Sequence, residues 1–498
     1  MLQHIIDSAK LLQPETTLTV TFCVLLLADL FIRRKSNVTG WLALGGLVIA
    51  GCFVAEQRGV TSSIFNNMFA VDAFSTFFKF LILLTSGSVI ALSLQSNELQ
   101  SGTRRLGEYY ALLMSLTLGM FLMSGASNLL MMYLALELTS LSSYILAGYT
   151  KEARDSSEAS LKYILYGAVS SGLMLYGISI LFGLTGAVDI YGVQNALAHH
   201  DVNSLTLVVA GVLIVAGFGY KISAAPFHFW TPDVYEGAPI TITAFLAVAS
   251  KAAGFAMMIR FFTVAFMNVE ASRELLGTWT IFRGFEWNHL LAILSVLTMT
   301  LGNLAALGQR NLKRLLAYSS IAHAGYMLLG VVVLSSQGLA AVLIYFAVYF
   351  FMNIGAFYVV MLVANKTGSE DIDDYNGLGR RSPLIGVAMT IFLLSLTGIP
   401  PTAGFVGKLY LFAALINANM IWLAIVGALN SVVSLYYYVR ILRNMYLREA
   451  ASSAEPIRFS ILQTTLLLCF VLPIVFFGIY FGPLVEYAQA SIGMFGVH

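Results

Sequence analysis

The chain has 498 residues, of which 58% are apolar and only 10% are charged, and its mean hydropathy is +0.82. Soluble domains carry about 25% charged residues, so these values exclude a water-soluble globule, an intrinsically disordered chain and a coiled coil. The formal net charge of +2 gives no basis for nucleic-acid binding.

Apolar stretches long enough to span a bilayer recur from one end of the chain to the other. They are too long, and alternate too little, for the strands of a membrane β-barrel, so the sequence predicts an all-α polytopic membrane protein. About fourteen membrane helices are expected, at residues 16–32, 39–55, 74–95, 108–125, 128–149, 159–183, 204–232, 239–265, 288–308, 315–334, 338–364, 384–415, 419–441 and 460–482. The first helix is expected to remain in the protein, because the residues before it do not resemble a secretory signal.

Lysine and arginine are distributed unequally between the two ends of these helices. Seventeen fall on the side that the chain reaches after its first helix, and five fall on the opposite side. Because basic loops remain in the cytoplasm, this split predicts a multi-pass protein of the cell inner membrane with both termini on the non-cytoplasmic side. An even number of helices is needed for both termini to share a side.

Five lysines belong to neither side and lie within the predicted membrane helices, namely Lys79, Lys162, Lys221, Lys251 and Lys408, and Glu137 near the middle of its helix is their acidic counterpart. A charge at the bilayer centre costs about 3 kcal/mol, and helix packing does not need it, so these residues indicate an ion or proton path. Lys79 is the exception, because its stem can snorkel to the interface and a structural role is favoured. For Lys162 both roles remain open, and for the others a structural ion pair is the alternative.

Glycine and proline interrupt two of the predicted helices. The first interruption follows Lys221 in GFGYKISAAPFHFWTPDVYEGAP, and the second precedes Lys408 in SLTGIPPTAGFVGKLYLF. Matching breaks in the two halves of a transporter mark its transport site, because the freed backbone groups must face protein or water. The two lysines are 187 residues apart. The same spacing leads from Glu137 to the neighbour of His323 and from Lys251 to Tyr438, so the internal repeat is only partial.

Two histidines lie near these charges. His228 follows the first break and His323 lies within the helix predicted at 315–334. Histidine carries protons near neutral pH, and a simple hydrogen-bonding role is the alternative. Metal and cofactor sites are not expected, because the three cysteines form no CxxC pair and the chain contains no P-loop, GxGxxG or HExxH motif.

Several specific sequence runs are distributed over most of the chain: ASLKYILYGA, KISAAPFHFWTPDVYEGAP, NLKRLLAYSSIAHAGY, and DDYNGLGRRSPL followed by LSLTGIPPTAGFVGKLYLF. In these runs the chain resembles the antiporter-like membrane subunits of respiratory complex I, the proton-pumping NADH:quinone oxidoreductase. The run PPTAGFVGK is most similar to the subunit N (subunit 2) branch of that family.

The resemblance implies two inverted five-helix repeats, formed by helices 4–8 and 9–13, in which helices 7 and 12 are broken. The corresponding division of the chain is an N-terminal three-helix segment, a first repeat, a second repeat and a C-terminal helix with its tail, at residues 1–107, 108–265, 288–441 and 442–498.

The resemblance also implies roles for single residues. Glu137 and Lys221 match the carboxylate–lysine pair of the first half-channel, Lys251 matches the central lysine, and Lys408 matches the lysine of the second half-channel. Lys162 and His228 match relay positions. No cofactor is expected in this chain, since NADH, FMN, the iron–sulfur clusters and quinone are expected in partner subunits, and other membrane subunits of complex I are expected on both flanks.

The expected function is therefore proton translocation through buried lysine, glutamate, histidine and water, coupled to quinone reduction elsewhere in the complex. The chain would act as a subunit of the translocase and carry no redox centre itself. Two alternatives remain open at this point: a subunit of a multisubunit sodium/proton antiporter, and a non-pumping membrane scaffold whose buried charges hold neighbouring helices.

Overall fold

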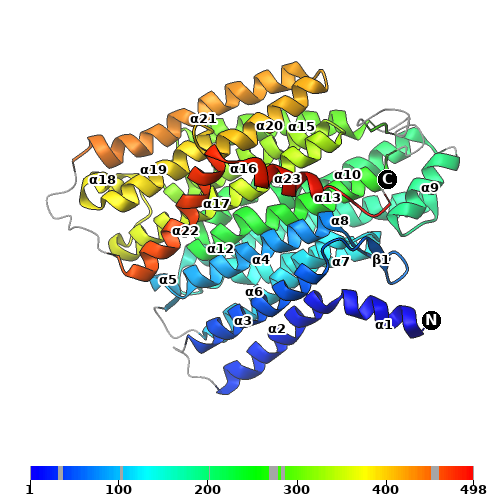
Figure 1. Cartoon of the computed structure of the whole chain (residues 1–498), viewed down its shortest axis with the longest axis horizontal. Helices are drawn as coiled ribbons and strands as arrows, with labels where there is room; N and C mark the ends of the chain where they lie inside the picture. Colours follow the sequence, from blue (N-terminus) through cyan, green and yellow to red (C-terminus); the bar gives the residue numbers. More distant parts are fainter. Residues whose placement is uncertain are drawn as a thin grey trace.

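The computed structural model describes residues 2–31, 37–100, 105–200, 202–267, 279–281, 286–449 and 459–496. These residues form a bundle of long helices, and the two termini lie at the same end of it (Figure 1). In the described part, thirteen helices are long and apolar enough to cross a membrane, and two shorter apolar helices follow one another as a broken fourteenth crossing. The predicted all-α membrane fold and its fourteen helices are confirmed.

The N-terminal segment contains four helices, a single helical turn and a two-stranded antiparallel hairpin that pairs Ser63 with Ala70. Its elements are α1 (Leu2–Leu11), α2 (Gln13–Phe31), α3 (Val38–Glu56), β1 (Ser62–Ile64), β2 (Phe69–Val71), α4 (Ala73–Ser93) and α5 (Asn97–Gln100). The start of α4 is fixed by a capping box, in which the Asp72 carboxylate accepts from the Ser75 backbone N–H at 2.8 Å. The sequence analysis did not predict α1, α5 or the hairpin, which are too short for a membrane span.

The next part of the chain ends in a continuous buried helix built from α12, a π-helical turn and α13. Its elements are α6 (Leu106–Gly125), α7 (Leu129–Ala147), α8 (Arg154–Thr185), α9 (Ile190–His199), α10 (Ser204–Ile222), α11 (Trp230–Gly237), α12 (Ile240–Phe245), η1 (Leu246–Ser250) and α13 (Lys251–Ala265). The predicted helix at 204–232 is thus split into α10 and α11, as its glycines and prolines indicated.

The remaining part begins after residue 286 and contains the second broken helix, formed by α19 and α20. Its elements are α15 (Trp287–Ala306), α16 (Leu312–Val332), α17 (Ser336–Thr367), η2 (Ile372–Tyr375), α18 (Leu378–Arg381), α19 (Pro383–Thr397), α20 (Ala403–Asn417), α21 (Ile421–Leu447), α22 (Ile461–Ile479) and α23 (Gly482–Ala490).

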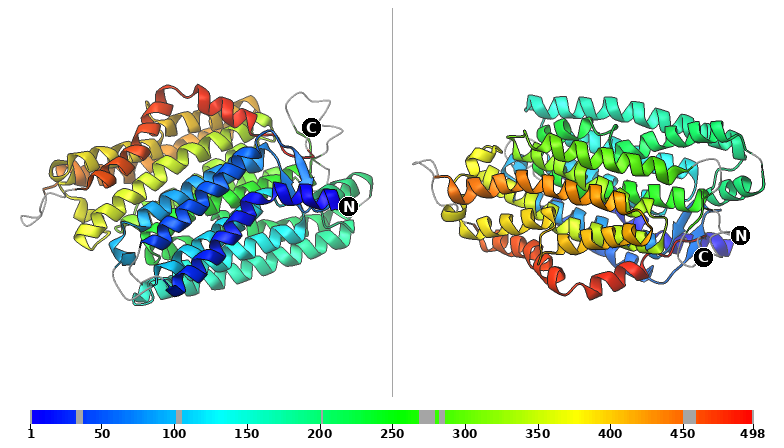
Figure 2. Two further views of the ribbon diagram at one scale, coloured as in Figure 1. Left: turned by 60° about the horizontal axis from the view of Figure 1, so that its bottom comes forward. Right: turned by 90° about the horizontal axis from the view of Figure 1, so that it is seen from above.

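Burial separates the inner helices from the outer ones. In the apolar 18-residue stretch of each helix, all residues of Ile240–Ala265 are buried, as are 94% in α16 and 89% in α17, but only 28% in α8 and 22% in α22. Figure 2 shows α8 along one edge of the bundle and α22 along the opposite edge. The core of the protein is therefore formed by the helices that carry Lys251 and His323.

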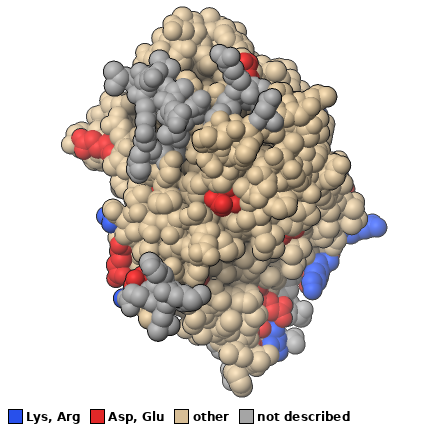
Figure 3. Space-filling view, turned by 90° about the vertical axis from the view of Figure 1, so that its right-hand side faces the viewer, with Lys and Arg blue, Asp and Glu red and all other residues tan. Residues whose placement is uncertain are grey.

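The end of the bundle that carries the termini shows few basic residues on its described surface (Figure 3). This distribution agrees with the charge asymmetry of the sequence, although the compartment itself remains a prediction. Seven of the basic residues counted for that asymmetry lie outside the described residues, namely Arg33, Arg34, Lys35, Arg104, Arg273, Arg283 and Arg458.

Equivalent backbone positions of the two helix breaks are 175 residues apart in the sequence, whereas Lys221 and Lys408 are 187 residues apart. Ser223 and Gly398 are both left-handed, and a cis proline follows each of them, Pro226 in the first break and Pro401 in the second. With this spacing, Lys408 matches Asp233 instead of Lys221. The alignment of the two lysines is therefore wrong, because backbone conformation defines the break and the side chains occupy opposite sides of it.

Candidate functional site

The first break ends α10 just after Lys221. Ser223 adopts the left-handed conformation with φ of 61°, and its N–H donates to the Tyr220 carbonyl at 3.1 Å. The Trp230 indole donates to the same carbonyl at 3.1 Å, and the Ala225 N–H donates to the Thr298 hydroxyl at 2.9 Å. The backbone groups freed by the break are thus bonded within the protein and do not face lipid.

Lys221 is buried at the end of α10, and its Nζ donates to the Ser140 hydroxyl of α7 at 3.4 Å. Glu137 lies one turn before Ser140 on the same helix and acts electrostatically on Lys221. Among the ion pairs between described residues, none joins these two side chains, and the Glu137 Oε1 atom has no hydrogen-bond partner. The structure thus holds this predicted pair at a distance, with Ser140 as the direct contact of the lysine.

Glu137 also lines a cavity of about 340 Å³ that opens between α7 and α8. Tyr133, Tyr144 and Ser171 supply the other polar groups of this cavity, and exposed apolar side chains such as Leu141 surround its mouth. The carboxylate is half-buried, so it lies between the cavity and the buried Lys221. The cavity therefore opens on the outer, membrane-spanning face of the bundle, where lipid or a neighbouring chain can approach Glu137.

Lys251 begins α13 directly after the π-helical turn η1. Its Nζ donates to the Ser320 carbonyl at 2.9 Å and to the Ser320 hydroxyl at 2.6 Å, and it lies 6.0 Å from the centre of the Tyr235 ring. Single π-helical turns occur frequently at functional sites. The sequence analysis missed this turn, because LAVAS contains neither glycine nor proline that would signal an irregular helix.

His228 lies between α10 and α11 and is buried. Its ring is stacked on Phe229, and its Nδ1 atom has no hydrogen-bond partner among the described residues. It lies within electrostatic range of Lys251. No hydrogen bond between described side chains joins Lys221 to Lys251, and the open Nδ1 atom of His228 offers a hydrogen-bond partner for a water molecule.

His323 is buried in α16 between two tyrosines. Its Nδ1 atom is hydrogen-bonded to the Tyr345 hydroxyl at 2.8 Å, and its Nε2 atom to the Tyr438 hydroxyl at 3.4 Å. The histidine lies within electrostatic range of both Lys251 and Lys408. It therefore occupies the position between the central lysine and the last lysine.

Lys408 lies in the first turns of α20, after the second break, and is buried. Its Nζ donates to the carbonyls of Thr397 and Leu396 at 2.8 and 3.3 Å, and to the Ser431 hydroxyl at 3.0 Å. The two carbonyls belong to the carboxyl end of α19, which carries a partial negative charge. The broken helix thus stabilises the ammonium group of Lys408 without a carboxylate.

Lys162 lies apart from these three lysines. Its side chain is 37% exposed, and its Nζ forms ion pairs with Glu158 at 2.7 Å and with Asp233 at 2.6 Å. Asp233 also forms an ion pair with Arg314 at 2.7 Å. Partial burial opposes ionisation of Asp233, but hydrogen bonds from Lys162 and Arg314 hold the pKa of this carboxyl below its usual range. The sequence analysis named Lys162 but missed both partners: Asp233 comes from α11, whereas Glu158 lies one turn earlier on α8 itself.

Lys79 is fully buried, so the prediction that it snorkels to the interface is wrong. Its Nζ lies 2.7 Å from the Glu15 carboxylate of α2 and donates to the Gln57 side chain at 3.0 Å. An acidic residue from another helix therefore neutralises Lys79 inside the bundle, and the side chain does not need to reach water.

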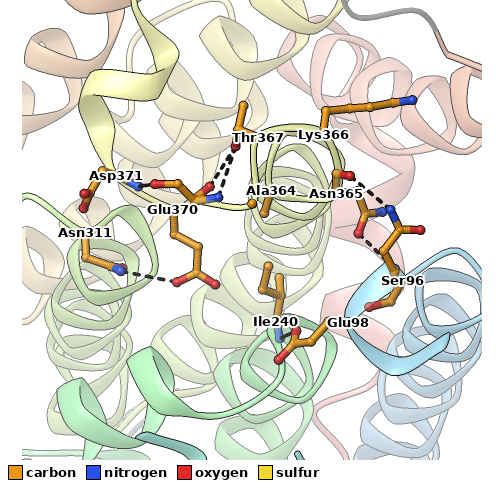
Figure 4. Close-up of a pocket in the computed structure, with 13 residues that line it drawn as sticks. Ser96, Glu98, Ile240, Asn311, Ala364, Asn365, Lys366, Thr367, Glu370 and Asp371 are labelled. Atoms are coloured by element: carbon orange, nitrogen blue, oxygen red, sulfur yellow. Dashed lines mark hydrogen bonds between the residues drawn. The ribbon is translucent and has the colours of Figure 1, made fainter. Parts of the chain in front are cut away.

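A second, larger pocket of about 790 Å³ lies at the bundle end opposite the termini (Figure 4). Glu98 accepts from the Ile240 N–H at 3.3 Å at its floor, and Asn311 donates to Glu370 at 3.3 Å at its side. Since Ile240 begins the continuous helix that carries Lys251, the pocket opens at the first turn of that helix.

Comparison with known proteins places this arrangement in a family. Residues 126–434 match the family described as NADH:quinone oxidoreductase/Mrp antiporter, TM, and the chain belongs to this family of antiporter-like membrane proteins. The resemblance stated from the sequence runs is thereby confirmed.

Within the family, the similar relatives are subunits N. The chain is 48% identical to NADH-quinone oxidoreductase subunit N 2 of Chloroherpeton thalassium, over 97% of this chain and 94% of that protein. It is 45% identical to NADH-quinone oxidoreductase subunit N of Anaeromyxobacter sp., over 98% and 97% of the two chains. A chain of respiratory complex I from Thermus thermophilus matches it with 31% identity and a TM-score of 0.79, over 96% and 99% of the two chains.

The fold extends to more distant complexes. A chain of the Mrp complex from Dietzia sp. has a TM-score of 0.81 at 20% identity, over 98% of this chain and 97% of that chain, which shows a shared fold alone. The antiporter alternative is therefore not favoured, because the high sequence identities are with subunits N.

Proposed function

We propose that this chain serves as subunit N of an NADH-quinone oxidoreductase and moves protons across the cell inner membrane through its buried lysines. The observation that carries the proposal is the shared chemistry of Lys221, Lys251 and Lys408. Each is almost fully buried, and among the described residues each donates hydrogen bonds only to hydroxyl or carbonyl oxygens. A buried amine without a carboxylate contact binds its proton weakly, which suits a group that must both accept and release it.

The separation between Glu137 and Lys221 provides a switch. At about 4 Å and an effective dielectric constant near 20, a carboxylate attracts an ammonium group by about 4 kcal/mol. Moving one charge against 100 mV requires about 2.3 kcal/mol. Approach of Glu137 therefore favours the protonated form of Lys221, and its withdrawal favours release, with a free-energy difference sufficient for pumping.

The proposed proton route runs from the cytoplasm past Lys221 to Lys251, with His228 and water between them. It continues through His323 to Lys408 and leaves on the non-cytoplasmic side. Lys162 supports the uptake end from its ion-pair network. The chain itself holds no redox centre in this proposal, and quinone reduction in partner subunits supplies the free energy through membrane subunits on both flanks.

The test is to replace Lys221 or Glu137 by alanine in the whole complex and to reconstitute the purified complex into liposomes. Protons pumped per NADH oxidised should fall at least about tenfold, since losing an interaction of about 1.5 kcal/mol with an ionised group changes an equilibrium by about that factor. Lys366→Ala serves as the control, because this lysine is exposed at the end of α17. A normal pumping ratio in assembled Glu137→Ala complexes would remove the carboxylate from the mechanism.

The same preparation separates the alternatives. A non-pumping scaffold predicts that neutralising Lys221 and Lys251 reduces assembly and leaves the pumping ratio unchanged. A sodium/proton antiporter predicts sodium-dependent transport and purification without NADH- or quinone-reacting subunits.

A further inference from the structure

The half-helix α11 is held in place by charges. After the break at Ser223, its backbone no longer continues α10. The first turn of α16 provides three contacts to it. Lys313 Nζ donates to the Ala238 carbonyl at 2.9 Å, and Arg314 Nη1 forms ion pairs with Asp233 at 2.7 Å and with Glu236 at 2.5 Å. Two consecutive basic residues of α16 thus attach the middle and the end of α11 and the residue that follows it.

The same contacts connect distant parts of the chain. The other oxygen of Asp233 pairs with Lys162 of α8, so this carboxylate bridges α8 and α16. Lys313 also pairs with Glu370 at 2.8 Å, which extends the network to the segment after α17 and to the pocket of Figure 4. Asp233, Glu236 and Arg314 are all partly exposed, with side chains between 29% and 37% accessible, so the pairs lie at the end of the bundle.

Helix α16 carries the partners of the buried amines farther along its length. Ser320 binds Lys251, His323 follows one turn later, and the Tyr326 ring lies 4.4 Å from the Nζ of Lys408. Ser320 follows Arg314 by six residues, which corresponds to about 9 Å along a helix. A continuous helix moves as one body, so a shift of its first turn by about 1 Å along the direction of the 2.6 Å bond between Ser320 and Lys251 would lengthen that bond beyond hydrogen-bonding distance.

We propose that Arg314 is a positioning residue that couples the half-helix α11 to α16, so that a change at the Lys221 break alters the bond between Lys251 and Ser320. The break supplies the hinge on one side, and the ion pairs transmit the displacement on the other. This inference rests on the proposed proton-translocating function, and it adds a mechanical connection between its first and central lysines.

The experiment is Arg314→Gln in the whole complex, with assembly, NADH oxidation and protons pumped per NADH measured in liposomes. Glutamine cannot pair with Asp233 or Glu236, so the pumping ratio should fall at least about twofold in assembled complexes. Arg314→Lys keeps the positive charge and should restore part of the ratio. Arg448→Gln is the matched control, because Arg448 forms a single exposed ion pair with Asp373 that joins neither α11 nor α16.

A wild-type pumping ratio in assembled Arg314→Gln complexes would overturn the coupling, since a merely structural pair would reduce assembly or thermal stability alone. If Arg314→Gln does not assemble, Glu236→Gln replaces it, because Arg314 then keeps Asp233 and loses one partner. An unchanged ratio in that variant also overturns the inference. Lys221→Ala in the same preparation separates the two proposals. If Lys221→Ala loses pumping while Arg314→Gln keeps a normal pumping ratio, the coupling is rejected and the proposed proton-translocating function stands. If Lys221→Ala pumps normally, the proposed function itself is rejected.

Discussion

At the scale of single residues, the buried lysines differ in their partners. Lys79 has a carboxylate at 2.7 Å, whereas Lys251 and Lys408 bind only hydroxyl and carbonyl oxygens. The Glu15 carboxylate compensates the buried charge of Lys79, which is the contact expected of a structural residue. In the proposed mechanism the amines without a carboxylate contact are the ones that exchange protons, so the proposal assigns the two roles by the partner of each lysine and not by its depth.

Replacing Lys79 by methionine should destabilise the complex by about 3–5 kcal/mol, because Glu15 would remain buried without its partner. The double variant Lys79→Met with Glu15→Leu should recover most of that loss, since both charges are then absent. Thermal unfolding of the purified complex measures the effect. The pumping ratio should stay normal in both variants, and a specific pumping defect in the double variant would place this ion pair in the proton route.

At the scale of elements, the irregular parts of the helices determine where the amines lie. The break at Gly398 exposes the last carbonyls of α19 to Lys408, and η1 precedes Lys251. Gly398 has φ of 87°, and a Cβ atom there would lie 2.8 Å from the Cδ atom of Lys408. Gly398 therefore has two reasons to be glycine: its left-handed backbone conformation, and the close approach of the Lys408 side chain.

Gly398→Ala should lower the proton-pumping ratio and destabilise the protein by about 1–2 kcal/mol. Gly368→Ala is the matched control, because Gly368 has a similar φ of 71° and no atom within 4 Å of the added Cβ. The control should show the backbone cost alone, measured by thermal unfolding, with normal pumping. Equal pumping in the two variants would show that the Lys408 position does not depend on Gly398.

At the scale of the whole molecule, two features bring the two termini to the same end of the bundle: the even number of membrane crossings and a buried ion pair. Arg260 binds the Asp72 carboxylate with two hydrogen bonds of 2.7 and 2.9 Å, and the Phe495 N–H donates to the same carboxylate at 3.0 Å. Burial opposes the charge of Asp72, but the Arg260 guanidinium holds its pKa below the usual range. The C-terminal tail is thus attached to the start of α4 at the end that carries the N-terminus.

Reporter fusions test the predicted orientation. Alkaline phosphatase fused to the C-terminus should be active, and green fluorescent protein fused there by the general secretion route should be dark, because both termini are expected outside the cytoplasm. Fusions after Gly368, at the other end of α17, should give the opposite results. Activity of the phosphatase only at Gly368 would reverse the orientation and the direction of proposed transport.

The membrane class, the fourteen crossings and the two breaks could be predicted from the amino-acid sequence, because hydrophobic length and the glycine and proline positions are local properties. It also identified the buried charges, since a charge inside an apolar run is visible without a structure. The partners of these charges became visible in the folded chain: Glu15 pairs with Lys79, Arg314 pairs with Asp233, and Ser320 accepts a hydrogen bond from Lys251, each from a distant segment. The physical reason is that a charge in a low-dielectric interior is controlled by its nearest neighbours in space, and helix packing, which one sequence does not show, brings those neighbours together.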